Sequence, residues 1–164
     1  MENKDKLKAL KNIDLSHLDK AEAKEFTVLL EELEKREFQE KATSTFMDFV
    51  KSVWPAFIEG RHHKVMGEAF EEVANGDVKR LIVNMPPRHT KSEFASYLLP
   101  AWFLGRFPEK KVIQTAHTAE LATGFGRKVR NLFQDEAFNN IFPDVTLRSD
   151  SKAAGRWNTN KGGD

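Results

Sequence analysis

The chain has 164 residues, of which 40% are hydrophobic and 31% are charged, and its formal net charge is +1. This length and composition are typical of a globular protein that has one domain with a real core. The absence of cysteine excludes disulfides and thiolate metal sites, and the sequence has neither an apolar run long enough to span a bilayer nor a signal-peptide core near its first residues.

Residues 1–41 are polar and favour helix. Asp19 or Ser16 is placed to cap a helix whose apolar residues recur at i, i+3, i+4 and i+7. These residues are Phe26, Leu29, Leu30 and Leu33. Charged residues occupy the other faces, with i,i+4 pairs such as Glu31 and Lys35. We expect an amphipathic helix that packs on the core or lies partly free, rather than one with a specific partner helix.

Two further helices are expected before residue 80. The first follows Thr45 and ends at Pro55, with one aromatic-rich face that consists of Phe46, Phe49, Val50, Val53 and Trp54. The second runs from Val65 to Ala74 and ends at Asn75-Gly76, where glycine supplies a left-handed cap. Its inward residues are expected to be Val65, Met66, Ala69, Phe70 and Val73.

His62 and His63 are adjacent, which raises the possibility of a metal site. Neighbouring residues on a helix point about 100° apart, and no cluster of Cys or acidic residues with ligand spacing accompanies the pair. A position at the start of a helix or on the surface is therefore the favoured interpretation.

The segment Leu81–Tyr97 organises the rest of the chain. The apolar run Leu81–Val83 predicts a strand, and the two prolines that follow Met85 exclude helix. From Lys91 onward, hydrophobic residues recur at helical spacing, namely Ala95, Leu98, Leu99, Trp102 and Phe103. A strand, a tight loop and a helix that opens on Lys-Ser are the layout of a phosphate-binding loop.

Each part of this layout has a chemical role. N–H groups at a helix N-terminus, with the helix dipole behind them, bind polyphosphate. Lys91 would reach the β- and γ-phosphates, and the Ser92 hydroxyl would ligate Mg²⁺. The usual pattern, G-x-x-x-x-G-K-[ST], has glycine where this chain has Met85 and Thr90, and a β-branched residue adopts positive φ only at a cost. The alternative is a strand-to-helix turn with a solvated lysine.

The stretch LIVNMPPRHTKSE, followed by LLPAWFLGRFPEKKVI, resembles the large terminase subunit of tailed bacteriophages, the motor that packages viral DNA into proheads. The loop of that family often reads P-P-R-x-G-K-S, and residues 86–92 match it except at Thr90. The stretch LATGFGRKVRNL, residues 121–132, is also similar to that family, and the resemblance extends weakly to residues 1–41.

This resemblance implies that the loop binds ATP and Mg²⁺. The cofactor-binding residues would be Pro87, Arg88, His89, Thr90, Lys91 and Ser92. Ser92 would hold the metal, and Lys91 and Arg88 would act in catalysis, with Arg88 stabilising charge on the γ-phosphate as an arginine finger does. A solvated loop charge is the alternative for Arg88. The resemblance also makes Trp54–His63 a candidate wall for the adenine.

The helix that follows Ser92 meets Pro100, which removes a backbone hydrogen bond, so a break or kink is expected near Leu99. A second strand, Lys111–Ala116, comes next, and this alternation favours an α/β fold with parallel strands. Thr115, His117 and Thr118 then stand where α/β proteins bind ligands. A cap for the next helix is the favoured interpretation of Thr118.

That helix would turn Leu121, Phe125, Val129 and Leu132 inward. Arg127, Lys128 and Arg130 would lie on its other faces, within a region, residues 80–130, that holds nine Lys and Arg against three acids. Such a basic face suits DNA phosphate or the nucleotide of a neighbouring subunit, and it is equally explained by solubility.

P-loop hydrolysis also needs a carboxylate at the end of an apolar strand and another that orients water. No run of four apolar residues followed by Asp or Glu occurs here. In large terminases that strand follows a segment like Trp157…Gly163, and a nuclease domain comes later. We therefore expect an α/β fold, a partial P-loop NTPase domain of the RecA/ASCE type with an incomplete sheet. Residues 1–60 would be a helical N-terminal extension and residues 61–164 a truncated ATPase domain.

The expected function is that of the N-terminal, ATP-binding portion of a phage large terminase, and ATP turnover by this chain alone stays open. The resemblance implies double-stranded viral DNA, the small terminase subunit and the portal as partners, a homo-oligomer at full length, no membrane, and the host-cell cytoplasm. One alternative is a fragment of another P-loop nucleic-acid translocase. Another is a non-catalytic remnant that binds DNA or a partner through its basic face.

Overall fold

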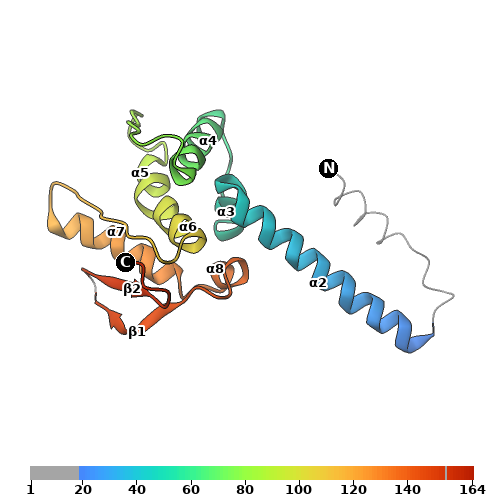
Figure 1. The fold of residues 1–164 in the computed structure, drawn as a ribbon. Coiled ribbons are helices and arrows are strands. Elements are labelled where there is room, and N and C mark those ends of the chain that lie inside the picture. The colour runs from blue at the N-terminus through green and yellow to red at the C-terminus, as the bar shows by residue number, and fades with distance from the viewer. Residues whose placement is uncertain (1–18, 154) are drawn as a thin grey trace. The chain divides into compact units, whose positions relative to one another are not determined.

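The computed structural model describes residues 19–153 and 155–164 (Figure 1). The elements are α2 (Lys20–Ser44), α3 (Phe46–Val53), α4 (Arg61–Asn75), α5 (Lys91–Glu93), the π-helix η2 (Phe94–Leu98), α6 (Leu99–Arg106), α7 (Ala119–Leu132), α8 (Glu136–Ile141), β1 (Leu147–Lys152) and β2 (Trp157–Thr159). Backbone packing separates the residues up to Glu40 from a second unit, Lys41–Asp164. The expected domain boundary after residue 60 falls inside this second unit, because α3 and α4 pack into one core.

The first unit contains most of α2, whose start is fixed by a reciprocal cap. Asp19 Oδ1 accepts hydrogen bonds from the N–H groups of Ala21 and Glu22, at 2.7 and 2.9 Å. Glu22 Oε2 in turn accepts from the Asp19 N–H at 3.0 Å. This arrangement is a capping box, which confirms Asp19 as the cap. Ser16, the other candidate, lies outside the described residues.

The core of the second unit is built around the Phe46 ring, which is fully buried. Three aromatic rings meet it edge to face, those of Phe70, Phe94 and Trp102, with centroids 5.4, 5.4 and 5.6 Å away. Because these rings come from α4, η2 and α6, one side chain of α3 ties together the helices before and after the candidate loop. α3 ends before Pro55, as expected.

α4 buries part of the face that the sequence predicts. It begins at Arg61, which confirms that His62 and His63 open a helix, and it ends at Asn75 with Gly76 at φ 88° as the left-handed cap. Val65 is 61% exposed, so the expectation that it points inward is wrong. Met66 and Phe70 are buried as expected, and the other buried positions are His63, Gly67 and Ala74. His63 thus occupies a core position, although a prediction based on hydrophobic residues would not place a histidine there.

Pro100 is accommodated by a wide helical turn. η2 joins α5 to α6 in one continuous run from Lys91 to Arg106, and the N–H of Leu99 bonds to the carbonyl of Phe94, five residues earlier. Proline has no N–H for the carbonyl of Ser96, four residues before it. That carbonyl accepts from Gln114 Nε2 at 2.6 Å instead. The irregularity expected near Leu99 is therefore a π turn, and the helix continues beyond it.

A second aromatic cluster closes the other end of this unit. Phe133, Phe138, Phe142 and Trp157 pack ring against ring, and Phe49 of α3 joins them. The Trp157 indole N–H donates to the carbonyl of Gly126 at 3.1 Å, which attaches β2 to α7.

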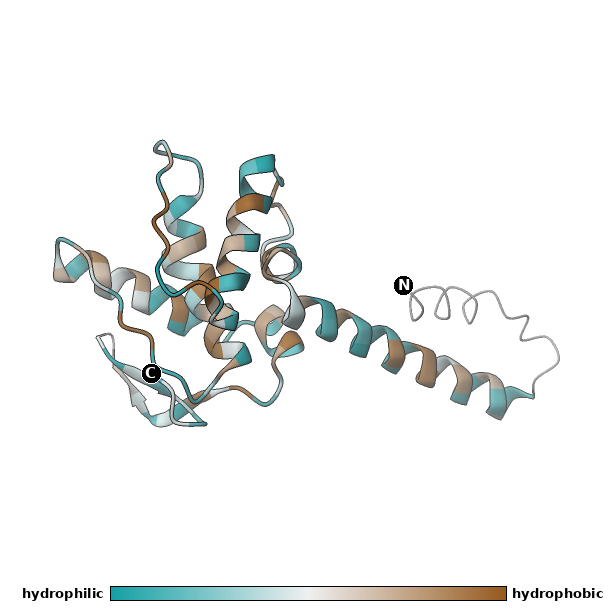
Figure 2. Ribbon diagram, turned by 45° about the horizontal axis from the view of Figure 1, so that its top comes forward, coloured by the Kyte–Doolittle hydropathy of each residue, from teal (hydrophilic) through white to brown (hydrophobic). Residues whose placement is uncertain are grey.

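The two expected parallel strands are not formed. Within residues 19–153 and 155–164, the sheet consists of β1 and β2, which are antiparallel with Leu147 opposite Thr159. Leu81–Val83 and Lys111–Ala116 both lie outside the sheet, although each contains hydrophobic residues (Figure 2). Ile82 and Ile113 are 85% and 89% exposed. A β-prone sequence becomes a strand only where a neighbouring strand satisfies its N–H and C=O groups, and the described sheet, β1 with β2, includes no partner strand for either segment.

One parallel contact is nevertheless present. The N–H of Val112 donates to the carbonyl of Asp164 at 2.6 Å, and the N–H of Asp164 donates to the carbonyl of Lys110 at 3.3 Å. Two bonds from one residue to the neighbours of Lys111 are the pattern of a parallel ladder. Along this segment, Val112 and Gln114 are half-buried and Ile113 is exposed, which is the alternation of a strand.

Candidate phosphate-binding site

The loop between Met85 and Lys91 turns through two left-handed residues. Arg88 has φ 63° and Thr90 has φ 58°, and in the described part of the chain all other positive φ angles belong to glycine. A non-glycine residue in this region costs about 1–2 kcal/mol. Two such residues in one loop indicate a conformation that the surrounding structure imposes, and strain of this kind is concentrated at functional sites.

Thr90 leads directly into the helix that starts at Lys91. It stands at the N-cap position, but its side chain makes no cap hydrogen bond. The first N–H groups of the helix, those of Lys91, Ser92 and Glu93, therefore receive no side-chain acceptor from the cap residue. A left-handed residue followed by helical ones directs successive N–H groups into an anion-binding concavity. The backbone thus has the form that a phosphate needs.

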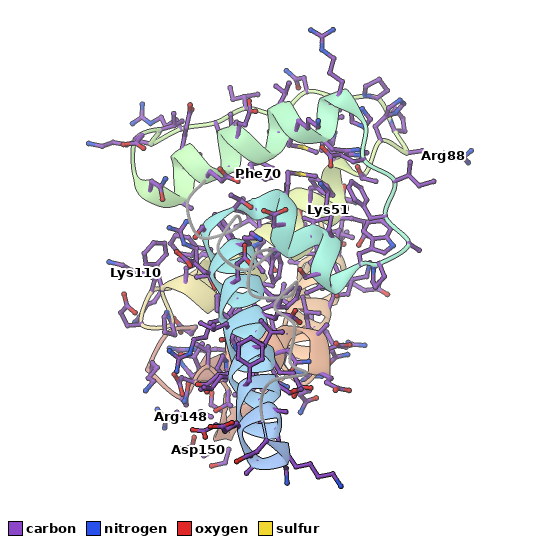
Figure 3. The ribbon with its side chains drawn as sticks, turned by 90° about the vertical axis from the view of Figure 1, so that its right-hand side faces the viewer. Lys51, Phe70, Arg88, Lys110, Arg148 and Asp150 are labelled. Carbon is purple, nitrogen blue, oxygen red and sulfur yellow. The ribbon has the colours of Figure 1, made fainter. Side chains whose placement is uncertain are left out.

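The charged side chains of the loop are available to a ligand. Lys91 is half-buried and Ser92 is exposed. Arg88 is exposed at the edge of the molecule, far from Phe70 in the core (Figure 3). Among the described residues, neither Lys91 nor Arg88 has a carboxylate partner for its charged group. The nearest acid along the helix, Glu93, is paired with Lys128 at 2.8 Å. The predicted phosphate ligands therefore carry uncompensated positive charge.

A chain of hydrogen bonds connects α4 to this loop. The N–H of Gly60 donates to His63 Nδ1 at 2.8 Å. The proton of the neutral ring then lies on Nε2, which is 2.6 Å from Thr90 Oγ1 and donates to it. The Thr90 hydroxyl donates onward to the carbonyl of His89 at 2.6 Å. In this series of three hydrogen bonds, each group either donates or accepts in a way that is consistent with its neighbours.

His63 is 6% exposed, and its ring contacts those of Phe57 and Phe94, with centroids 4.7 and 5.1 Å away. Burial lowers its pKa below the ordinary value of 6.5. The neighbouring imidazoles of His62 and His89 act in the same direction, and the carboxylate of Glu59 opposes them. The ring is therefore neutral at neutral pH, as its hydrogen bonds require.

The predicted adenine wall, Trp54–His63, is connected to the loop by the hydrogen bond between His63 and Thr90. The Trp54 ring is 36% exposed and lies 5.4 Å from the ring of Phe57, which in turn contacts His63. An aromatic surface of this kind is suited to stacking a nucleobase. The hydrogen bond between His63 and Thr90 was not predicted from the sequence, since the two residues are 27 positions apart and no local pattern relates them.

Thr118 and Thr115, near the end of Lys111–Ala116, have different surroundings. Thr118 accepts from the N–H of Leu121 at 3.3 Å and begins α7, which confirms its interpretation as a helix cap. Thr115 lines a hollow of about 590 Å³ together with Ser92, Ser96 and Gln114. Thr115 therefore lines the same cavity as Ser92, the predicted Mg²⁺ ligand.

The basic face of α7 is smaller than the sequence suggests. Lys128 Nζ is paired with Glu93 and lies 5.8 and 5.7 Å from the ring centres of Tyr97 and Phe125. Arg130 donates to Asn131 Oδ1 at 3.2 Å. Arg127 is exposed. Leu121 is 41% exposed, so its expected inward position is wrong, whereas Val129 and Leu132 are buried as expected.

The fit to the implied ligands differs between phosphate and metal. The loop offers two cations and N–H groups that receive no acceptor from the side chain of Thr90, and both suit a polyphosphate. No group of three His, Asp or Glu side chains in the described part of the chain could hold a metal ion. Mg²⁺ in nucleotide sites uses one or two protein oxygens and takes the rest from phosphate and water, so the Ser92 hydroxyl is compatible with it.

Comparisons with protein-family models, with curated proteins and with solved structures find no match for this chain. Among the described helices, none combines the length and the apolar character that crossing a membrane requires.

Proposed function

We propose that this chain is the ATP-binding part of a bacteriophage large terminase subunit, and that residues 87–92 bind the triphosphate of Mg·ATP. The observation that carries the proposal is the backbone of Thr90, which is left-handed at φ 58° and opens an uncapped helix at Lys91. The sequence resemblance supplies the family, and this geometry supplies the reason why the loop suits phosphate although glycine is absent from it.

In this proposal the N–H groups that follow Thr90 cradle the β- and γ-phosphates. Lys91 neutralises their charge as a mobile ammonium, and Ser92 contributes a hydroxyl ligand to Mg²⁺. Arg88, which is exposed and unpaired within the described chain, adds charge stabilisation at the γ-phosphate. The aromatic surface of Trp54 and Phe57 takes the base. When bound, Mg²⁺ would neutralise charge on the phosphates.

The proposal extends to the assembly that the resemblance implies. A large terminase works on double-stranded viral DNA, together with the small terminase subunit and the portal, in the host cytoplasm. The hydrogen bonds of Asp164 with Lys110 and Val112 follow the parallel pattern and are compatible with the proposed α/β arrangement.

Calorimetric titration with Mg·ATP tests the proposal. We expect Lys91→Ala to weaken binding by about 1–3 kcal/mol, the contribution of charge-assisted hydrogen bonds. Lys79→Ala is the matched control, because it removes an equally charged, exposed side chain that precedes the loop. Equal affinities of the parent and Lys91→Ala, or equal losses in both variants, would contradict a phosphate site at this loop.

A further inference from the structure

We propose that His63 is the positioning residue of the loop, because its Nε2–H group holds Thr90 in the left-handed conformation that a phosphate-binding loop usually obtains from glycine. The identity of the ligand that binds this loop rests on the proposed function, whereas the role of His63 in holding the loop does not.

The tautomer of the ring gives the contact its direction. Gly60 has an N–H and can only donate, so Nδ1 of His63 must accept and Nε2 must carry the proton. Nε2 therefore donates to Thr90 Oγ1, and the hydroxyl hydrogen is directed to the carbonyl of His89. This hydroxyl is thereby committed to the loop and cannot cap the helix, which leaves the helix N–H groups for a ligand.

The ring is held on a rigid support. It fills a core position of α4 and packs in a three-ring cluster with Phe57 and Phe94, and Phe94 also packs on the central Phe46 ring. The turn before α4 is fastened by Glu59, which pairs with Lys51 of α3 and lies 3.4 Å from Lys64 Nζ. Lys51 lies on α3 below the loop (Figure 3). The donor of the Thr90 hydrogen bond is thus fixed by contacts that do not involve the loop.

Thr90 is the residue that needs this support. A β-branched residue is disfavoured at φ 58°, whereas glycine adopts this conformation readily. The hydrogen bond from His63 Nε2–H offsets this cost, and the neutral ring also accepts from Gly60 through Nδ1. Protonation of Nδ1 would place two N–H groups face to face at Gly60. The contact therefore replaces a glycine with a side-chain pair whose partners lie 27 residues apart.

Two substitutions at His63 separate its two hydrogen bonds. Glutamine carries an acceptor and a donor on one carboxamide, so His63→Gln can accept from Gly60 and still donate to Thr90. Asparagine is one methylene shorter, so His63→Asn can accept from Gly60 but does not reach Thr90. We expect His63→Asn to weaken Mg·ATP binding about tenfold, the factor of one hydrogen bond of ordinary strength, and His63→Gln to stay within about threefold of the parent.

The background variant Thr90→Gly tests the mechanism. Glycine needs no support at this position, so adding His63→Asn to Thr90→Gly should leave affinity nearly unchanged. An equal loss in both backgrounds would show that His63 acts through general stability and would overturn the proposal. Parent-like binding by His63→Asn would overturn it as well.

A second measurement works without nucleotide. Trypsin cleaves after Arg88 and Lys91, so a released loop should be cut faster in His63→Asn than in His63→Gln, with thermal unfolding measured to confirm that both variants are folded. If no variant binds ATP but cleavage follows this order, the His63–Thr90 contact stands and the proposed function fails. If ATP binds and neither cleavage nor affinity differs between the two variants, the proposed function stands and the role of His63 is refuted.

Discussion

The packing of α6 against the second aromatic cluster can be tested with one pair of glycines. A Cβ atom added to Gly105 would lie 2.5–2.7 Å from three ring carbons of Phe142, whereas one added to Gly124 would meet no atom within 4 Å. Gly105 lies within α6 and Gly124 within α7, so alanine should improve helix propensity at both by about 0.5–1 kcal/mol. The two substitutions therefore differ in packing alone.

At Gly105 the overlap outweighs the gain. Inserting a methyl group into a filled core costs about 1–3 kcal/mol, because the neighbouring side chain must leave its rotamer or the helices must separate. Phe142 is itself packed against Phe49 and Phe138, so its ring has little room to move. We expect Gly105→Ala to lower the free energy of unfolding by about 1–2 kcal/mol. Gly124→Ala should raise it by about 0.5 kcal/mol.

Equilibrium urea unfolding, followed by tryptophan fluorescence, measures both changes under identical conditions. A change in midpoint at constant slope reports stability, and the two variants should move the midpoint in opposite directions. If Gly105→Ala is as stable as Gly124→Ala, Phe142 does not lie against α6 and the described packing of α6 with the second cluster is wrong.

Two further predictions concern pH and DNA. Because the pKa of His63 is lowered on folding, the unfolded chain binds more protons below about pH 6.5, and stability should fall as pH decreases through that range and stay level above it. His62, His89 and Glu59 also act on this ring, so the parent protein is compared with His63→Gln, which keeps these three groups. Urea unfolding at pH 7.5 and 5.5 measures the stability of both proteins. Identical pH dependence in the two would refute the assignment of this effect to His63. DNA binding should be independent of sequence and fall by orders of magnitude between about 50 and 200 mM salt. Arg127→Ala should weaken it more than Lys128→Ala, since Lys128 is already paired with Glu93, and a salt-insensitive affinity in fluorescence titrations would remove DNA from this account.

Features with local causes could be predicted from the sequence. The caps at Asp19, Gly76 and Thr118 depend on residues within a few positions, and all three occur where the pattern places them. Phe46, Phe49 and Val50 of α3 are buried as their helical spacing predicts, whereas Trp54 lies beyond the end of the helix and is 36% exposed.

Features with distant causes could not be predicted. Leu81–Val83 and Lys111–Ala116 have the composition of strands, but a strand requires partners that local sequence does not reveal. The contact between His63 and Thr90 joins residues of α4 and the loop, and its only local sign is that His63 stands three positions after Gly60. Loop residues 87–92 were predicted from the sequence as a phosphate site, whereas the hydrogen bond between His63 and Thr90 was visible only in three dimensions.

The wide turn of η2 also determines the phase of the helix that begins at Lys91. Each residue of an α-helix advances the side chains by about 100°, so one additional residue in a single turn rotates everything on one side of it by that angle. Trp102 cannot follow such a rotation, because its indole N–H donates to the carbonyl of Ala42 at 3.2 Å and its ring contacts Phe46. The direction in which Lys91 points is therefore set by the length of this turn. In a helix without the additional residue, the same core would direct Lys91 roughly a quarter of a revolution away from its present side.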